Sequence, residues 1–139
     1  MIMPRLGPLE RAVMDTVWAM PATASNTPAA RDLRGSLPKL AYTTVITVLD
    51  RLVQKGLLER VSDDRPHRYR ATGSQASYAA GVMHEALAAT SYPSGALIMF
   101  VEMATPEQLA ALRGGLAIGR RAQIESRENE EVLVWANRP

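Results

Sequence analysis

The sequence contains no cysteine, which excludes disulfide bonds and every metal site that depends on thiolate ligands. Histidine is almost as scarce, since His67 and His84 are the only two and neither has a partner at metal-ligand or catalytic-triad spacing. No apolar run approaches the roughly 18 residues that a membrane span requires, and the N-terminus lacks the apolar core of a secretory signal. We therefore expect a cytoplasmic protein with no membrane partner, no metal and no cofactor.

Signatures of enzymes are missing as well. The pair Gly114-Gly115 does not follow a strand pattern, so it does not resemble a nucleotide-binding loop. The pair His84-Glu85 has no second histidine or cysteine nearby, and an exposed pair on a helix is the simpler interpretation. We therefore expect no catalytic residues and a protein that is not an enzyme.

Aromatic residues make up only 5% of the chain whereas hydrophobic residues reach 47%, so the core must be mostly aliphatic. The net charge is only +2, but it is unevenly distributed. Residues 1–73 hold eleven basic and seven acidic residues, a net +4, and residues 74–139 hold five and seven, a net −2. This division suits a DNA-binding module joined to a module of another kind, although ordinary surface scatter explains it equally well.

Two short helices are expected to open the chain. Pro8 fits the first position of a helix that runs to about Ala19. After a small polar loop, Thr27 fits the N-cap of a second helix with Pro28 as its first residue. The buried stripe of the first helix is predicted to comprise Leu9, Ala12, Val13, Thr16 and Val17.

The third helix has the clearest pattern, over residues 41–55, with Gly56 as a left-handed C-terminal cap. Residues 57–71 then predict a β-hairpin, with strands at 57–61 and 67–71 around a polar turn. Three helices followed by a hairpin is the order of a winged helix. The expected fold is therefore mainly α with a small β-hairpin wing (α+β), divided into residues 1–73 and 74–139. The buried stripe of the third helix is predicted to comprise Val45, Ile46, Leu49, Leu52 and Val53.

The opposite side of this third helix carries short hydroxyl and long basic side chains. Threonine is a mediocre helix former, so Thr43, Thr44 and Thr47 within five residues favour a role in reading base edges. Arg51 lies one turn further on and Lys39 precedes the helix, where each is placed to reach DNA phosphate. The alternative is that these residues are the solvated face of an ordinary helix.

The hairpin carries cations that suit a DNA-binding wing. Arg65 and Arg68 are the leading candidates for phosphate or minor-groove contacts. Strand alternation sends Tyr69 to the other face, toward the core. The alternative is a solvated hairpin whose charges block edge-to-edge aggregation.

The second half predicts a helical dimerisation module, because an operator usually needs two half-sites related by a two-fold axis. Helices are expected at about 75–89 and 97–103, and a third is capped by Thr105 with Gln108 three residues later. The end of the chain is either an extension of that helix or a mobile tail, and the apolar residues could instead complete a monomeric core. The predicted dimer contacts are Tyr78, Val82, Leu97, Phe100, Val101, Leu109, Leu112 and Leu116.

Several stretches carry a pattern of known proteins beyond the general order of elements. They are Leu6-Gly7-Pro8-Leu9-Glu10, Val13-Met14-Asp15, Val17-Trp18, Leu40-Ala41-Tyr42-Thr43-Thr44-Val45, Thr47-Val48-Leu49-Asp50-Arg51-Leu52, Lys55-Gly56-Leu57-Leu58 and Arg68-Tyr69.

These stretches resemble the penicillinase-repressor family, which includes the methicillin-resistance and copper-transport repressors. The match is strong over residues 6–71 and looser to about residue 117. The resemblance implies a homodimeric repressor of antibiotic-resistance, metal-handling or stress-response genes, with a winged helix followed by a helical dimerisation domain. Its partner is then a double-stranded, palindromic DNA operator. The family's DNA contacts carry over to Thr43, Thr44, Thr47, Arg51, Arg65 and Arg68.

Two departures from the family pattern bear on regulation. The copper-responsive branch uses a C-terminal cysteine pair, so the absence of cysteine argues against copper sensing. The β-lactam branch is inactivated by a sensor protease that cuts between an asparagine and a phenylalanine, and the equivalent pair here is Met99-Phe100. Two other functions remain open, namely a multidrug-type regulator with an effector pocket and a winged domain used only for protein contact.

Overall fold

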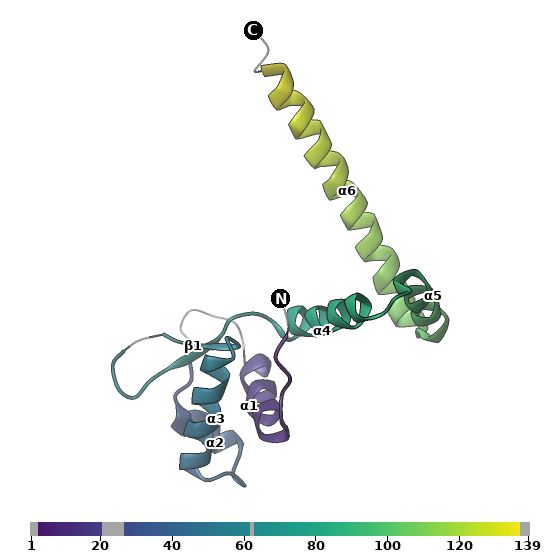
Figure 1. Ribbon diagram of the computed structural model, residues 1–139. Coiled ribbons are helices and arrows are strands. Elements are labelled where there is room, and N and C mark those ends of the chain that lie inside the picture. Colours follow the sequence, from purple (N-terminus) through teal and green to yellow (C-terminus); the bar gives the residue numbers. More distant parts are fainter. Residues whose placement is uncertain (1–2, 21–26, 62, 137–139) are drawn as a thin grey trace. The chain divides into compact units, whose positions relative to one another are not determined.

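The computed structural model describes residues 3–20, 27–61 and 63–136, with side chains of the last helix described to residue 127. The chain divides into two compact units, Met1–Ala89 and Thr90–Pro139. The first unit contains α1 (Pro8–Ala19), α2 (Ala30–Ser36), α3 (Tyr42–Gln54), β1 (Leu58–Arg60), β2 (Tyr69–Ala71) and α4 (Gln75–Ala89), and the second contains α5 (Pro93–Met103) and α6 (Pro106–Ala136) (Figure 1). This is the expected winged-helix order, mainly α with a two-stranded wing.

Helix α1 begins at Pro8 and ends at Ala19 as expected, but its buried face differs from the predicted stripe. Leu9 is 44% exposed, whereas Met14 is fully buried. The buried face is rotated by about one residue, since it comprises Glu10, Val13, Met14 and Val17. The carboxylate of Glu10 on this face is paired with Lys55, whose Nζ lies 2.5 Å away. The prediction that Leu9 belongs to the core is therefore wrong.

Helix α2 begins later than predicted, at Ala30 and not at Pro28. The prediction that Thr27 is the N-cap is wrong, because the Asp32 carboxylate instead accepts the Ala29 N–H at 3.0 Å. Residues 27–29 run beside the wing, where Tyr69 N donates to Pro28 O at 3.0 Å and Ala29 forms an antiparallel bridge with Arg68. This segment therefore lies beside the hairpin as a short third strand-like segment.

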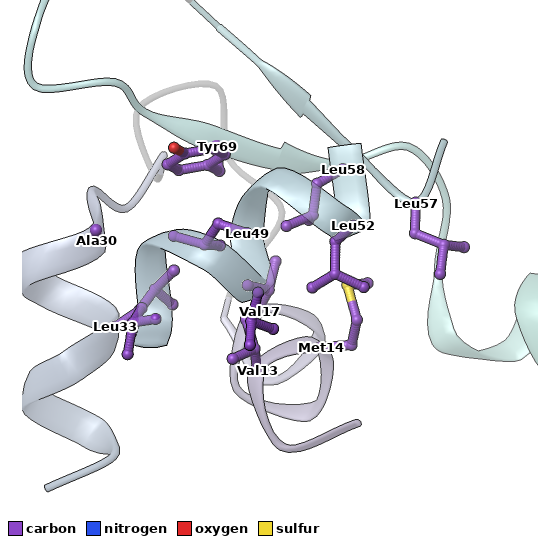
Figure 2. Packing of buried hydrophobic residues seen from close by; sticks show 12 residues of the cluster. Val13, Met14, Val17, Ala30, Leu33, Leu49, Leu52, Leu57, Leu58 and Tyr69 are labelled. Atoms are coloured by element: carbon purple, nitrogen blue, oxygen red, sulfur yellow. The ribbon is translucent and has the colours of Figure 1, made fainter. Parts of the chain in front are cut away.

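Helix α3 lies at the centre of the first unit and packs on α1, α2 and β1 (Figure 2). Gly56 follows it with φ 78°, the left-handed conformation predicted for it, and turns the chain into β1. β1 pairs antiparallel with β2, Arg60 opposite Tyr69. As expected, the core is almost wholly aliphatic; it comprises Val13, Met14, Val17, Ala30, Leu33, Val45, Val48, Leu49, Leu52, Leu57, Leu58 and Tyr69.

Helix α4 belongs to the first unit by its contacts, which places the unit boundary after Ala89. The ring of Tyr78 packs against that of Trp18, with 5.4 Å between centroids. A functional division at residue 73 stays a prediction.

The second unit consists of two helices. α5 begins at Pro93, so Gly95 lies inside the helix and not in the loop that the sequence suggested. The predicted capping box of α6 is confirmed, since Thr105 N donates to Gln108 Oε1 at 2.9 Å and Gln108 N to Thr105 Oγ1 at 3.2 Å. The backbone of α6 stays helical to Ala136, so the described part of the C-terminal region is an extension of this helix. Within the described ranges, no helix is long and apolar enough to cross a membrane.

Candidate nucleic-acid interface

One face of α3 is buried and the other presents the residues predicted to read DNA. Val45, Val48, Leu49 and Leu52 face the core. We call Thr43, Thr44, Thr47 and Arg51 the reading face; three of them are exposed and Thr44 is half-buried. The Thr47 hydroxyl donates to Thr43 O at 3.0 Å, which leaves its lone pairs and its methyl group directed to solvent.

The cations at the edges of this face are free of intramolecular ion pairs within the part of the chain that the structure describes. Lys39 is exposed in the turn that precedes α3, and Arg51 is exposed in its last turn. Arg65 is exposed in the turn of the wing. Each can therefore bind phosphate without first breaking an ion pair.

Asp50 and Arg60 connect α3 to the wing. Arg60 Nη2 donates to Asp50 Oδ1 at 2.7 Å. The pKa of Arg60 is raised, first by this hydrogen bond and then by that with the neighbouring Tyr69 hydroxyl. The rim of the wing is thus held beside the reading face by a side-chain bridge.

A cleft of about 590 Å³ lies between the first turns of α3 and the wing. Tyr42, Asp50, Arg60, Arg65 and His67 contribute to its lining. His67 Nδ1 is buried and has no hydrogen-bond partner among the described residues. Cationic and hydrogen-bonding side chains therefore gather where α3 meets the wing.

Arg68 occupies a more structural position than predicted for a wing cation. Its Nη1 donates to Thr27 O at 2.9 Å, which ties the wing to the segment before α2. The residue is still exposed, and its remaining N–H groups can serve a phosphate. Arg70 points to Glu59 instead, with 2.6 Å between Arg70 Nη2 and the carboxylate. Of Arg65, Arg68 and Arg70, Arg65 is therefore the one with no described hydrogen bond or ion pair to the rest of the chain.

A model of the family described as penicillinase repressor matches residues 6–117. The transcriptional regulator BlaI of Mycobacterium tuberculosis, found in two strains, is 42% identical over 118 residues, which cover 81% of this chain and 83% of the relative. The chain belongs to the penicillinase repressor family. It is accordingly a DNA-binding transcriptional repressor and not an enzyme, as the sequence analysis expected. The family match ends at residue 117, about five turns before the end of α6 at Ala136.

In a single chain, large apolar side chains of the second unit of this penicillinase-repressor homologue are exposed. Leu97 is 50% exposed, Phe100 40% and Leu116 73%. Val101 and Leu112 are exposed as well, and Leu109 is half-buried. Two helices alone cannot bury these side chains, which leaves them available to a partner.

The two predicted dimer residues in α4 lie in the first unit. Val82 is 42% exposed and available to a partner. Tyr78 is half-buried: its ring packs on Trp18 and its hydroxyl donates to Pro4 O at 2.7 Å. A contact of Tyr78 with a partner copy stays a prediction, and the contacts described for Tyr78 lie within its own chain.

Among the described residues no cluster of three metal-binding side chains is present.

Sequence reasoning missed Tyr42, Asp50, Arg60 and His67 as members of the interface. The sequence could have indicated Tyr42, because this residue lies in the first turn of α3 beside Thr43. Asp50 and Arg60 had none, since ten residues and a change from helix to strand separate them. Only the folded wing brings them together.

Proposed function

We propose that this repressor binds a palindromic operator as a homodimer, with α3 in the major groove and the wing, residues 57–71, on the sugar–phosphate backbone. The observation that carries the proposal is the composition of α3. Its inner face is aliphatic and fully buried, and its outer face carries three threonines and an arginine beside a cationic wing. A major groove about 12 Å wide admits one such helix.

Within this arrangement the side chains divide by chemistry. Thr43, Thr44 and Thr47 suit base edges, because a hydroxyl bonds polar groups while the methyl packs on thymine. Arg51 suits guanine or a phosphate one turn further along. Lys39, Arg65 and Arg68 suit phosphates, which fix the protein on the duplex without specifying sequence.

The homodimer rests on the second unit. Exposed leucine, phenylalanine and valine side chains on α5 and α6 give an apolar surface that a second copy can cover. A closed two-fold dimer presents two identical α3 helices, which matches an operator with dyad symmetry. The contacts that we assign to it are Val82, Leu97, Phe100, Val101, Leu109, Leu112 and Leu116.

We further propose antibiotic-resistance or stress-response genes as targets. Two release steps are proposed: dissociation of a marginal dimer as its concentration falls, and cleavage by a sensor protease between Met99 and Phe100. Met99 and Phe100 lie in the middle of α5, on the apolar surface assigned to the dimer. A protease needs an extended chain, so α5 must open locally before it is cut. Cleavage between these residues would remove half of the apolar surface of α5.

Selection of bound DNA from a random pool tests the proposal. The expected winners contain two inverted half-sites, and affinity for them falls steeply with salt because phosphate contacts release counterions. Sedimentation of the same protein should show a dimer. A winged domain used only for protein contact would enrich no sequence and would show no salt-dependent DNA binding.

A further inference from the structure

The segment before α1 is held between α4 and the rest of the first unit. Tyr78 Oη donates to Pro4 O at 2.7 Å, and Lys55 Nζ donates to Arg5 O at 2.9 Å. The Met3 N–H donates to the Glu85 carboxylate, one turn beyond Gly81. Residues 3–5 therefore join the end of α3 to the first three turns of α4. Figure 1 shows this segment, in purple, passing the start of α4.

Two further contacts make this connection rigid. Trp18 Nε1 donates to Gly73 O at 3.2 Å, and its ring packs on Tyr78. Gly81 leaves room for the Met3 side chain, because a Cβ there would lie 2.7 Å from Met3 Cγ. We call residues 3–5 together with Trp18, Lys55, Tyr78 and Gly81 the N-terminal clasp. The clasp fixes the direction in which α4 leaves the winged helix.

That direction has a consequence for DNA binding. α4 has 15 residues, a length of about 22 Å. A tilt of about 10° would move its far end by about 4 Å, close to the rise of one base pair. Val82, one of the residues assigned to the dimer, lies on α4 itself and is 42% exposed. A tilt of α4 therefore shifts this contact relative to α3 and changes the separation of the two reading faces.

We infer that the N-terminal clasp selects the spacing between the two half-sites of the operator, with Tyr78 and Gly81 as its positioning residues. The inference rests on the proposed homodimer and its palindromic site. A closed clasp admits one spacing, and another spacing is bound only when the clasp opens. The cost of opening then sets how strongly the wrong spacing is rejected.

Two variants loosen the clasp in different ways. Tyr78→Phe keeps the ring on Trp18 and removes the hydrogen bond to Pro4 O. Gly81→Ala forces the flexible Met3 side chain out of its place against α4 while raising the helix propensity of α4, so a loss of helix stability cannot explain its effect. Tyr92→Phe is the matched control, because Tyr92 is 68% exposed and its hydroxyl has no described bond to the clasp.

The experiment measures the affinity of intact dimers for operators with half-sites moved by one or two base pairs, and for a single half-site. For Tyr78→Phe we expect the preference for the best spacing to fall about fivefold, the effect of one ordinary hydrogen bond. For Gly81→Ala we expect a fall in the same direction, because the Met3 side chain must move. Their single half-site affinity should stay within about twofold, since the reading face is untouched. Tyr92→Phe should reproduce the parent spacing profile.

Spacing profiles that coincide for the parent and both clasp variants would overturn the inference, as would an equal flattening in Tyr92→Phe. A parent that binds all spacings equally would overturn it too. These outcomes differ from failure of the proposed function, in which the parent is monomeric or selects no dyad-symmetric DNA at all.

Discussion

Arg60 of the wing and Asp50 of α3 form an ion pair, with 2.7 Å between Arg60 Nη2 and Asp50 Oδ1. Both side chains are close to half exposed, so the pair contributes little to the free energy of unfolding. Its effect is geometrical, because it holds β1 beside the reading face. An acidic residue near DNA is unfavourable by charge alone, so its presence on α3 indicates a positioning role.

The first prediction follows from this pair. Asp50→Ala should lower operator affinity about tenfold although it removes a negative charge near DNA, because the wing loses its anchor on α3. Arg60→Ala should have a similar effect, and the double variant should lose much less than the product of both. Fluorescence anisotropy with labelled operator measures the cycle, and thermal unfolding should change little. An Asp50→Ala protein that binds more tightly would show that charge outweighs positioning.

The second prediction concerns the reading face. Thr44→Ala should change which sequences are selected, because each base contact that is lost removes about 1–3 kcal/mol of discrimination. The measurement is a repeated selection from the random pool with the variant. Gln54→Ala is the control, since Gln54 is exposed at the far end of α3 and outside the reading face. Identical preferences for the parent and Thr44→Ala would remove Thr44 from the base contacts.

The third prediction concerns the wing. Arg65→Ala should weaken binding to every sequence alike and lower the salt slope by about one unit, since a wing cation meets phosphate. Arg68→Ala is a less clean probe, because it also breaks the bond to Thr27 O. Arg70→Ala serves as the control, since Arg70 is paired with Glu59. An Arg65→Ala protein with an altered sequence preference and an unchanged salt slope would place Arg65 at a base edge.

The sequence predicted those elements that repeat a pattern over several turns. α3 was found with its cap at Gly56, because aliphatic residues at helical spacing define one face. The predicted stripe omitted Val48, which is buried, and included Ile46 and Val53, which are half-buried. Tyr69 was assigned to the core correctly from strand alternation alone. The capping box at Thr105 and Gln108 was equally local and equally clear.

The errors arose where contacts distant in sequence decide local structure. Thr27 looks like a helix cap, but pairing of residues 27–29 with the wing holds it in an extended segment. Leu9 fits the apolar stripe of α1, but the face that packs on the core carries Val13, Met14 and Val17, with Glu10 beside them paired to the distant Lys55. The N-terminal clasp joins residues separated by more than 70 positions, as in the bond from Tyr78 to Pro4. No periodic pattern encodes such contacts.

The last prediction concerns the apolar surface of α5. Leu97→Asp should convert the dimer into a monomer, because a buried carboxylate without a partner is costly to desolvate. Operator affinity should then fall by about 100-fold or more, since the second half-site loses the effective concentration that linkage provides. Affinity for a single half-site should remain, because the reading face lies on α3.

Leu9→Asp is the matched control for this substitution. Leu9 is 44% exposed on α1 and Leu97 is 50% exposed on α5, so the two leucines differ in place more than in exposure. Sedimentation across a dilution series, with and without operator, measures the outcome for both variants. The control should stay dimeric and bind as the parent does, which separates a specific loss of the interface from a general effect of surface charge. A Leu97→Asp protein that remains dimeric at nanomolar concentration would move the dimer interface away from α5, and cleavage at Met99-Phe100 could then no longer act by separating the two copies there.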